Sequence, residues 1–422
     1  MNTLGIVGGG AGCIATLNQI TQHDHTIQTI YLFSEDHEQV GYAYKAAPDI
    51  FIMNTRLDSL TQFNDVLPIN QWLDNKNKHY EDDDYIPRDL YGKYLQSVKE
   101  RILDTLYQQG VNCEELPRAD YINSNGNVIS NDREYCVDAS VISIGFGSDL
   151  LNESLFEKIK NCDSSQPITL YGSGLSSIDI ILFAHKTNPN FKLNCRSLSG
   201  RFPRVRSQFK SDGDSIFDGL QDSEITYEGV LNRFHHCLNN ETEKGIVYDP
   251  NFSLTDEIQY CESTLPEWQR KLYNGTSNYL QVYQQLSHQD KRRFFEKRSS
   301  FIETRAMFPL KNAKKLATLI NDKQLTIEKG AYDPQSSKSH EVLGFNQSSR
   351  LDFVEKSRLP RHSIFGVDVD HTCQVKDHRS IFCLGPLTNG SRYFTEATSL
   401  TVRDAEVIVQ SLTNKQERRT YA

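Results

Sequence analysis

The chain has 422 residues, a net charge of −9 and 37% hydrophobic residues, enough for buried cores in two or three domains. The negative charge, with acidic runs such as residues 81–84, argues against a nucleic-acid partner, which would require a basic face. The sequence has neither the apolar run of about 18 residues that spans a membrane nor a signal-peptide pattern. We therefore expect a cytoplasmic protein without a membrane partner. Composition gives no indication of the oligomeric state.

The nine cysteines form no C-x-x-C pair and do not alternate with histidines at metal-ligand spacing. Their scatter through apolar segments is typical of reduced, packed thiols. His235, His236 and Cys237 come closest to a ligand cluster, but adjacent histidines point to different faces of any regular element. A solvated or substrate-facing helix is the preferred interpretation, and no metal is expected.

Residues 4–17, "LGIVGGGAGCIATL", predict a strand, a glycine turn and the start of a helix. Gly8 permits the tight turn, and Gly10 lets the backbone approach a pyrophosphate at the helix N-terminus, beside Ala11 and Gly12. The third position of the G-x-G-x-x-G pattern falls on Cys13, a small residue. The alternative is a glycine turn with nothing bound.

A dinucleotide site also needs an acid after the second strand, where it accepts hydrogen bonds from the adenosine ribose. Residues 27–33 predict that strand, and Glu35 follows it. The position directly at the strand end, where the ribose-binding acid normally stands, could instead be that of Ser34. The fingerprint, strand and acid together predict a dinucleotide site.

Three later stretches, "VGYAYKAAPDIFIMNT", "INQWL" and "YIPRDLYGKYLQSV", narrow the choice of dinucleotide. In their order and residue patterns they resemble the flavin domain of the FAD/NAD(P)-binding N-hydroxylating monooxygenases. This family includes the nitrosuccinate-forming aspartate N-monooxygenases. The resemblance implies that Asn54 lies along the flavin and that a helix starting near Arg88 supports it. It places cofactor contacts at Tyr44, Asn54, Thr55 and Arg88. The usual G-x-G-x-A-Y is shortened here to residues 41–44, so the loop is expected to differ. Spacing alone makes Tyr91, Tyr94 and Leu95 a packed helix stripe.

A second strand–turn–helix pattern occupies residues 168–185, "ITLYGSGLSSIDIILFAH". An apolar strand that ends near Gly145 precedes it and resembles the crossing strand of flavoproteins with two dinucleotides. The family carries G-x-G-L-x-x-x-D at this place, which ends here at Asp179. The predicted contacts with the second nucleotide are Gly172, Ser173, Gly174, Leu175 and Ser176. Gly145, at the end of the crossing strand, is also a predicted cofactor contact.

The strand after this second turn is followed by arginines rather than by an acid, namely Arg196, Arg201, Arg204 and Arg206. Guanidinium groups suit a 2′-phosphate, which an acid would repel, so NADPH is favoured over NADH, with Arg196 and Arg201 as its ligands. The alternative is a solvated edge or a site for a substrate carboxylate.

Residues 207–329 are rich in charged, helix-compatible residues, and residues 286–320 resemble the helical part of the family's second domain. Residues 212–265 match no pattern, so we expect structure specific to the substrate there. Near the C-terminus, a strand over residues 381–384 precedes a loop and a helix. In the family this strand returns to the first domain and its loop contacts the flavin, which implies cofactor contacts at Gly385, Pro386 and Thr388.

The sequence thus predicts an α/β fold with two Rossmann-like domains. The FAD domain comprises residues 1–165 and 371–422, and the NADPH domain comprises residues 166–370 with a helical insertion at about 207–329.

The resemblance implies a monooxygenase of specialised metabolism that uses oxygen, through a flavin C4a-hydroperoxide, to N-hydroxylate a small amine such as an amino acid. No catalytic side chain is assigned. Arg56, Arg305 and Arg392 are candidates for a substrate carboxylate, and the alternative for each is a structural role or a cofactor contact. The alternatives are an oxidoreductase acting on carbon, sulfur or an electron acceptor, and a non-catalytic flavin-binding regulatory protein.

Overall fold

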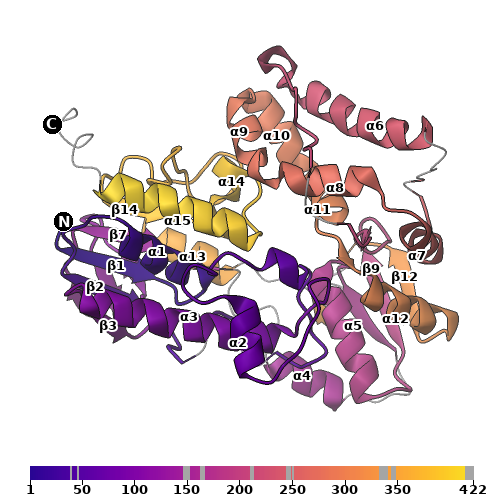
Figure 1. The fold of residues 1–422 in the computed structure, drawn as a ribbon, viewed down its shortest axis with the longest axis horizontal. Helices are drawn as coiled ribbons and strands as arrows, with labels where there is room; N and C mark the ends of the chain where they lie inside the picture. The colour runs from indigo at the N-terminus through magenta and orange to yellow at the C-terminus, as the bar shows by residue number, and fades with distance from the viewer. Residues whose placement is uncertain are drawn as a thin grey trace.

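The structure is a computed structural model that describes residues 1–38, 40–44, 47–145, 153–161, 167–209, 213–243, 249, 251–331, 341–343 and 348–413. Two parallel sheets lie at opposite ends of the molecule, and a group of helices stands beside the second sheet (Figure 1). Among the helices of these described ranges, none has both the length and the apolar character that crossing a membrane requires.

The first sheet has five parallel strands and joins the two ends of the chain. Its order is β14 (Ile381–Cys383), β7 (Ala139–Ile142), β1 (Thr3–Val7), β2 (Thr29–Phe33) and β3 (Asn112–Leu116). One face is covered by α1 (Ala11–Gln22), α3 (Arg88–Gln108) and α15 (Thr398–Thr413), where α1 packs between the other two (Figure 1). Tyr91, Tyr94 and Leu95 are buried in this core, so the predicted helix stripe is confirmed.

Smaller elements cover the other face of this sheet. An antiparallel sheet is formed by β4 (Tyr121–Ile122), β5 (Val128–Ser130) and β6 (Arg133–Tyr135), and α13 (Ser348–Lys356) packs on β4. Val7, Phe33 and Ile142 point from the main sheet into this second core. The strands are therefore buried on both sides, as their continuous apolar runs require.

The second sheet has four parallel strands in the order β12 (Leu325–Lys329), β9 (Leu193–Ser197), β8 (Ile168–Tyr171) and β13 (Glu341–Leu343). Its core includes side chains of α5 (Leu175–Thr187), α7 (Leu254–Ser263) and α12 (Leu310–Asn321), and α4 (Glu153–Lys160) packs on α5. Phe51, from the first domain, is buried in the same core, with its ring centroid 6.3 Å from that of Phe183. The two domains are thus packed together.

The remaining helices fill the chain between β9 and α12. They are α6 (Tyr227–Glu243), α8 (Glu267–Asn274), α9 (Tyr279–Gln285), α10 (His288–Glu296) and α11 (Arg298–Arg305), and a short parallel pair, β10 (Val205–Arg206) and β11 (Phe308–Pro309), anchors them. Their aromatic core also includes Tyr393 and Phe394, which follow α14 (Asn389–Arg392). The C-terminal segment therefore contacts both the first sheet and the helical region. The short helix α2 (Ile69–Asn75) lies in the first domain.

A buried ion pair joins the two domains between α3 and α5, the helix that follows the second glycine motif. Arg88 Nη1 on α3 lies 2.6 Å from Asp179 Oδ2 on α5. Burial raises the pKa of Asp179 to about 6, although Arg88 opposes this rise. The G-x-G-L-x-x-x-D aspartate thus holds the second domain against the first.

This ion pair predicts a pH dependence of stability. The folded-state pKa of Asp179, about 6, lies above its ordinary value of 3.8, so folding takes up a proton between these pH values. The stabilising contribution of the protonated group is complete below pH ~4 and is lost as the pH rises through ~6, by about 3 kcal/mol. Asp179→Asn lacks this titration. In urea unfolding of FAD-loaded protein, wild-type stability minus that of the variant should fall between pH 4.5 and 6.5; a flat or rising difference would contradict the assignment.

Candidate functional site

The first glycine turn joins β1 to α1 at the carboxyl edge of the main sheet. Gly8 has φ +109°, and an added Cβ would lie 2.7 Å from the carbonyl oxygen of Ser143, so only glycine fits. At Gly12 a Cβ would lie 2.8 Å from Leu384 Cδ1, so this residue provides the close contact between helix and strand. The sequence pattern assigned that position to Cys13, which is buried one residue further along.

Gly10 differs from its neighbours because the protein's own packing does not require a glycine there. A Cβ on Gly10 would have only one atom within 4 Å, Gly41 Cα at 3.8 Å, and its φ of −88° is open to any residue. It caps the N-terminus of α1, which Ala11 begins. This cradle fits a pyrophosphate, since backbone N–H groups at a helix N-terminus favour negative charge.

The acid predicted to hold the ribose follows β2 but is engaged elsewhere. Ser34 comes directly after the strand, and its Oγ donates to the carbonyl oxygen of Asp36 at 2.9 Å. Glu35 Oε1 accepts a hydrogen bond from Arg118 Nη1 at 2.5 Å, and both side chains are partly exposed. A ribose contact from Glu35 stays a prediction.

Two further glycines lie at the same sheet edge, because β1, β7 and β14 are adjacent. Gly145 follows β7 and Gly385 follows β14, and a Cβ at either would have no atom of the described residues within 4 Å. Pro386 and Thr388 bound a turn of 3₁₀ helix, in which Thr388 Oγ1 donates to the carbonyl oxygen of Gly385 at 2.8 Å. The structure thus brings these predicted residues together where parallel sheets bind ligands.

The shortened loop over residues 41–44 crosses the first glycine turn. Gly41 has φ +60°, and a Cβ there would lie 3.3 Å from Gly10 Cα. Tyr44 packs its ring 5.3 Å from that of Tyr91 and lies against Gly92. Asn54 and Thr55 are half-buried further along the same connection. Gly41 therefore leaves room above Gly10 that a larger residue would fill.

The second glycine turn repeats the geometry of the first. Gly172 has φ +109°, and Gly174, at the N-cap of α5, would have no atom within 4 Å of an added Cβ. Ser173 is buried between them, and Leu175 and Ser176 form the first turn of α5. This turn also fits a pyrophosphate, for the same reason as the first.

The four arginines after the second turn divide into two pairs. Arg196 is the penultimate residue of β9 and Arg201 follows the strand, and both side chains are partly exposed. Arg196 Nε lies 3.2 Å from Glu328, and Arg201 Nε lies 3.8 Å from Glu303. Arg204 and Arg206 are buried. The pairing of β10 with β11 directs this second pair into the protein rather than to the sheet edge.

Arg206 belongs to a buried cluster with Arg56 and Arg305. The guanidinium carbons of Arg206 and Arg305 lie 4.5 and 4.6 Å from the ring centroid of Tyr273. Arg206 Nη1 donates to the carbonyl oxygen of Asn54 at 3.2 Å, and Arg56 Nη1 donates to that of Phe209 at 3.1 Å. The cluster therefore reaches the residue that the family resemblance places along the flavin.

The cluster has more cations than anions. Arg56 Nη2 pairs with Asp58 at 2.7 Å, whereas among the described residues neither Arg206 nor Arg305 forms an ion pair with an acid. In the described part of the chain, the Nε atoms of all three arginines are buried without a hydrogen-bond partner. Burial lowers the pKa of Arg305, and Arg206 adds to this effect. Burial also raises the pKa of Tyr273, but the two guanidinium groups outweigh it and hold that pKa below its ordinary value. The arrangement suits a carboxylate ligand.

Arg392 has different surroundings from Arg56 and Arg305. Its Nε and Nη2 donate to the two carboxylate oxygens of Asp404, at 2.9 and 2.6 Å, and both side chains are buried. This bidentate pair ties α14 to α15. The structure therefore brings Arg56 and Arg305 together with Arg206 and Tyr273, and engages Arg392 in a structural pair instead.

Metal binding has no support among the residues that the structure describes. Within these ranges, no group of three or more His, Cys, Asp or Glu side chains could hold a metal ion. His235 and His236 are exposed on α6, whereas Cys237 is buried.

Comparisons with known proteins agree with this architecture. Residues 5–145 match a sequence-family model described as FAD-NAD(P)-binding. No curated protein matches the chain by sequence. Solved structures with the same fold include DfoA from Erwinia amylovora, described as a cadaverine monooxygenase of desferrioxamine biosynthesis bound to FAD. It has 13% identity and a TM-score of 0.58, over 97% of this chain and 94% of that one.

Two further solved structures cover 99% of both chains. Ornithine N-hydroxylase KtzI from Kutzneria sp. 744 has 10% identity and a TM-score of 0.52. L-lysine 6-monooxygenase from Pseudomonas syringae has 12% identity and a TM-score of 0.51. The predicted α/β fold is therefore confirmed, and it is the fold of N-hydroxylating flavin monooxygenases.

Proposed function

We propose that the protein is an FAD- and NADPH-dependent monooxygenase that N-hydroxylates a small amine carrying a carboxylate, such as an amino acid. The observation that carries this proposal is the buried arginine cluster, in which Arg206 donates a hydrogen bond to the carbonyl oxygen of Asn54. The chain also has two glycine turns that each fit a pyrophosphate. The shared fold supports it, because KtzI is described with reduced FAD, NADP⁺ and L-ornithine.

The residues at the edge of the main sheet would hold FAD, and those of the second turn would hold NADPH. In such an arrangement the bound flavin supplies hydride acceptance and oxygen activation. The protein contributes binding, orientation and the exclusion of water. This division of tasks is consistent with the lack of an assigned catalytic side chain in the sequence.

The arginine cluster would act on the substrate in two ways. Arg206 and Arg305 would bind its carboxylate, with Arg56 adding positive charge nearby. Their field would also disfavour a protonated amine, because a neighbouring cation lowers the pKa of an ammonium group. The substrate nitrogen would thus be held in its neutral, nucleophilic form.

Product mass tests the reaction. The FAD-loaded protein is incubated with NADPH, oxygen-18 gas and a panel of amino acids and amines. The proposal expects label on the nitrogen of one carboxylate-bearing amine. Label on carbon or sulfur would favour a different oxygenase, and label only in peroxide an oxidase. Flavin that NADPH does not reduce, with no consumption of oxygen, would favour a regulatory protein.

Arg196 and Arg201, near the carboxyl end of β9, predict a preference for NADPH over NADH. Arg196→Ala and Arg201→Ala should each weaken flavin reduction by NADPH about tenfold, because each removes a charge-assisted hydrogen bond to the 2′-phosphate. Reduction by NADH should stay within about twofold, since that nucleotide lacks the phosphate. The measurement is the apparent Kd for each nucleotide in rapid flavin reduction. An unchanged NADPH preference in both variants would assign these arginines to their ion pairs with Glu328 and Glu303.

A further inference from the structure

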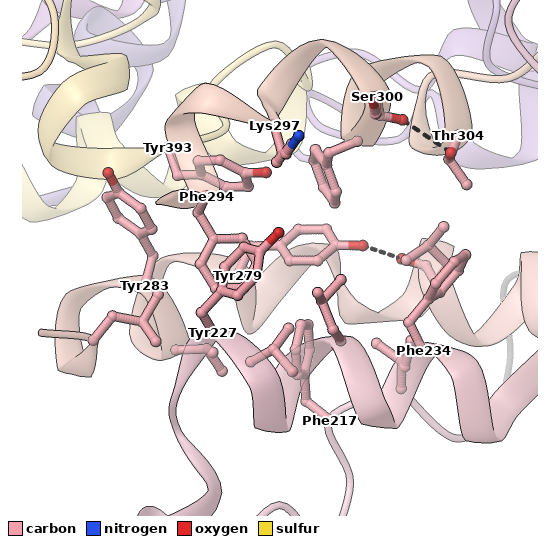
Figure 2. A pocket seen from close by; sticks show the side chains of 17 residues that line it. Phe217, Tyr227, Phe234, Tyr279, Tyr283, Phe294, Lys297, Ser300, Thr304 and Tyr393 are labelled. Carbon is pink, nitrogen blue, oxygen red and sulfur yellow. Dashed lines mark hydrogen bonds between the residues drawn. The ribbon is translucent and has the colours of Figure 1, made fainter. Parts of the chain in front are cut away.

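An aromatic cavity lies within the helical region and has no part in the proposed reaction (Figure 2). Its volume is about 210 Å³. It is enclosed by α6, α8, α9, α10 and α11, with Tyr393 from the C-terminal segment. Several wall residues, including Phe217, Tyr227 and Phe234, come from residues 212–265, the stretch that matches no pattern.

The cavity is lined mainly by apolar and aromatic groups, and two of its tyrosine hydroxyls already donate hydrogen bonds within the protein. The hydroxyl of Tyr279 donates to the carbonyl oxygen of Leu272 at 2.8 Å, and that of Tyr283 donates to the carbonyl oxygen of Gly390 at 3.1 Å. A cavity of about 150 Å³ with apolar walls stays dry and takes up benzene. This larger cavity therefore has room for a ring with a short chain.

One side of the cavity carries a positive charge. One wall is formed by α11, which contributes Ser300 and Thr304, and by Lys297, the residue directly before this helix. Figure 2 shows this wall opposite Phe217 and Phe234. Lys297 and Ser300 are exposed and so mark the mouth of the cavity. In the described part of the chain, Lys297 forms no ion pair with an acid.

The backbone is strained where the C-terminal segment forms the cavity wall. Tyr393 has φ 66° and ψ −58°, and the N–H of Phe394 donates to the carbonyl oxygen of Arg392 at 2.8 Å, which makes a γ-turn of the rare positive-φ type. The ring of Tyr393 stacks on that of Tyr283, with 5.0 Å between centroids. Strain of this kind persists only where packing enforces it, and it is concentrated at binding sites.

We propose that this cavity binds a small aromatic acid, with its ring among the aromatic side chains and its acidic group beside Lys297. None of Arg56, Arg206 and Arg305 lines this cavity, although Tyr279 in its wall contacts Arg305. The inference goes beyond the proposed reaction and does not depend on it.

Equilibrium binding to the FAD-loaded protein tests the proposal without turnover. The probes are 3-phenylpropanoate and its neutral match 3-phenylpropan-1-ol, measured by calorimetry. Both should bind to the wild-type protein, the acid about three- to fivefold more tightly, as expected for a partly exposed ion pair. Lys297→Gln should remove this preference. The matched control Arg292→Gln, an exposed charge on α10 that does not line the cavity, should keep it.

Filling the cavity is the stricter test. Val230→Phe places a ring in it from α6 and should abolish binding of both probes, with flavin content unchanged. Ser300→Phe, at the exposed mouth, tests the same point should Val230→Phe fail to fold. Absence of binding to the wild-type protein, or binding that survives both substitutions, would overturn the proposal.

Discussion

Gly10→Val is expected to give a folded protein without flavin, whereas Gly174→Val is expected to keep its flavin and lose its reduction by NADPH. Both glycines have negative φ, −88° and −71°, in extended conformations that valine adopts readily. A Cβ at either position meets no protein atom closer than 3.8 Å. The valine side chains would instead fill the space that a pyrophosphate needs.

The measurements are the visible spectrum of the purified variants, the identity of the released cofactor and the rate of flavin reduction. Gly12→Val is the contrasting control, since its Cβ would lie 2.8 Å from Leu384 Cδ1 and 3.0 Å from Ser143 Cβ. That substitution should lower the thermal stability of the fold as well as its flavin content. A Gly10→Val protein with a full complement of FAD would place the pyrophosphate elsewhere.

Local patterns were sufficient to predict both nucleotide turns. A strand, a glycine turn and a helix are encoded within about 15 consecutive residues, so Gly8, Gly10, Gly172 and Gly174 could be assigned from spacing alone. The pattern was wrong only about the residue that permits close packing. That role depends on Leu384 and Ser143, which directly follow β14 and β7, and no local sequence pattern predicts such contacts.

The arginine cluster could be predicted only in part. Arg56 and Arg305 were candidates because of their residue type, but Arg206 was grouped with the arginines at the nucleotide edge. Its burial follows from the pairing of β10 with β11, whose strands lie about a hundred residues apart in sequence. Tyr273, which carries both guanidinium contacts, has no local signal at all.

Arg305→Met and Arg392→Met are expected to differ strongly in their effect on the free energy of unfolding, although both arginines are buried. Arg392 is held by both oxygens of Asp404. Its replacement leaves a buried carboxylate with only Arg403 beside it, and should cost about 3–5 kcal/mol of unfolding free energy. Arg305 has no acidic partner among the described residues and is repelled by Arg206. Its replacement relieves burial of a charge, so we expect a change within about 1 kcal/mol, of either sign.

Ligand response separates the same two variants. Succinate, with succinamide as its neutral match, should raise the unfolding temperature of the wild-type protein by binding only the folded state. Arg392→Met should retain this rise from its lower starting point, because its arginine pairs within the protein. Arg305→Met should lose it, because the cluster then lacks one of the two guanidinium groups over Tyr273. If Arg305→Met were as destabilising as Arg392→Met and still responded to succinate, the Arg305 guanidinium would be a structural group, and the carboxylate would have to bind elsewhere.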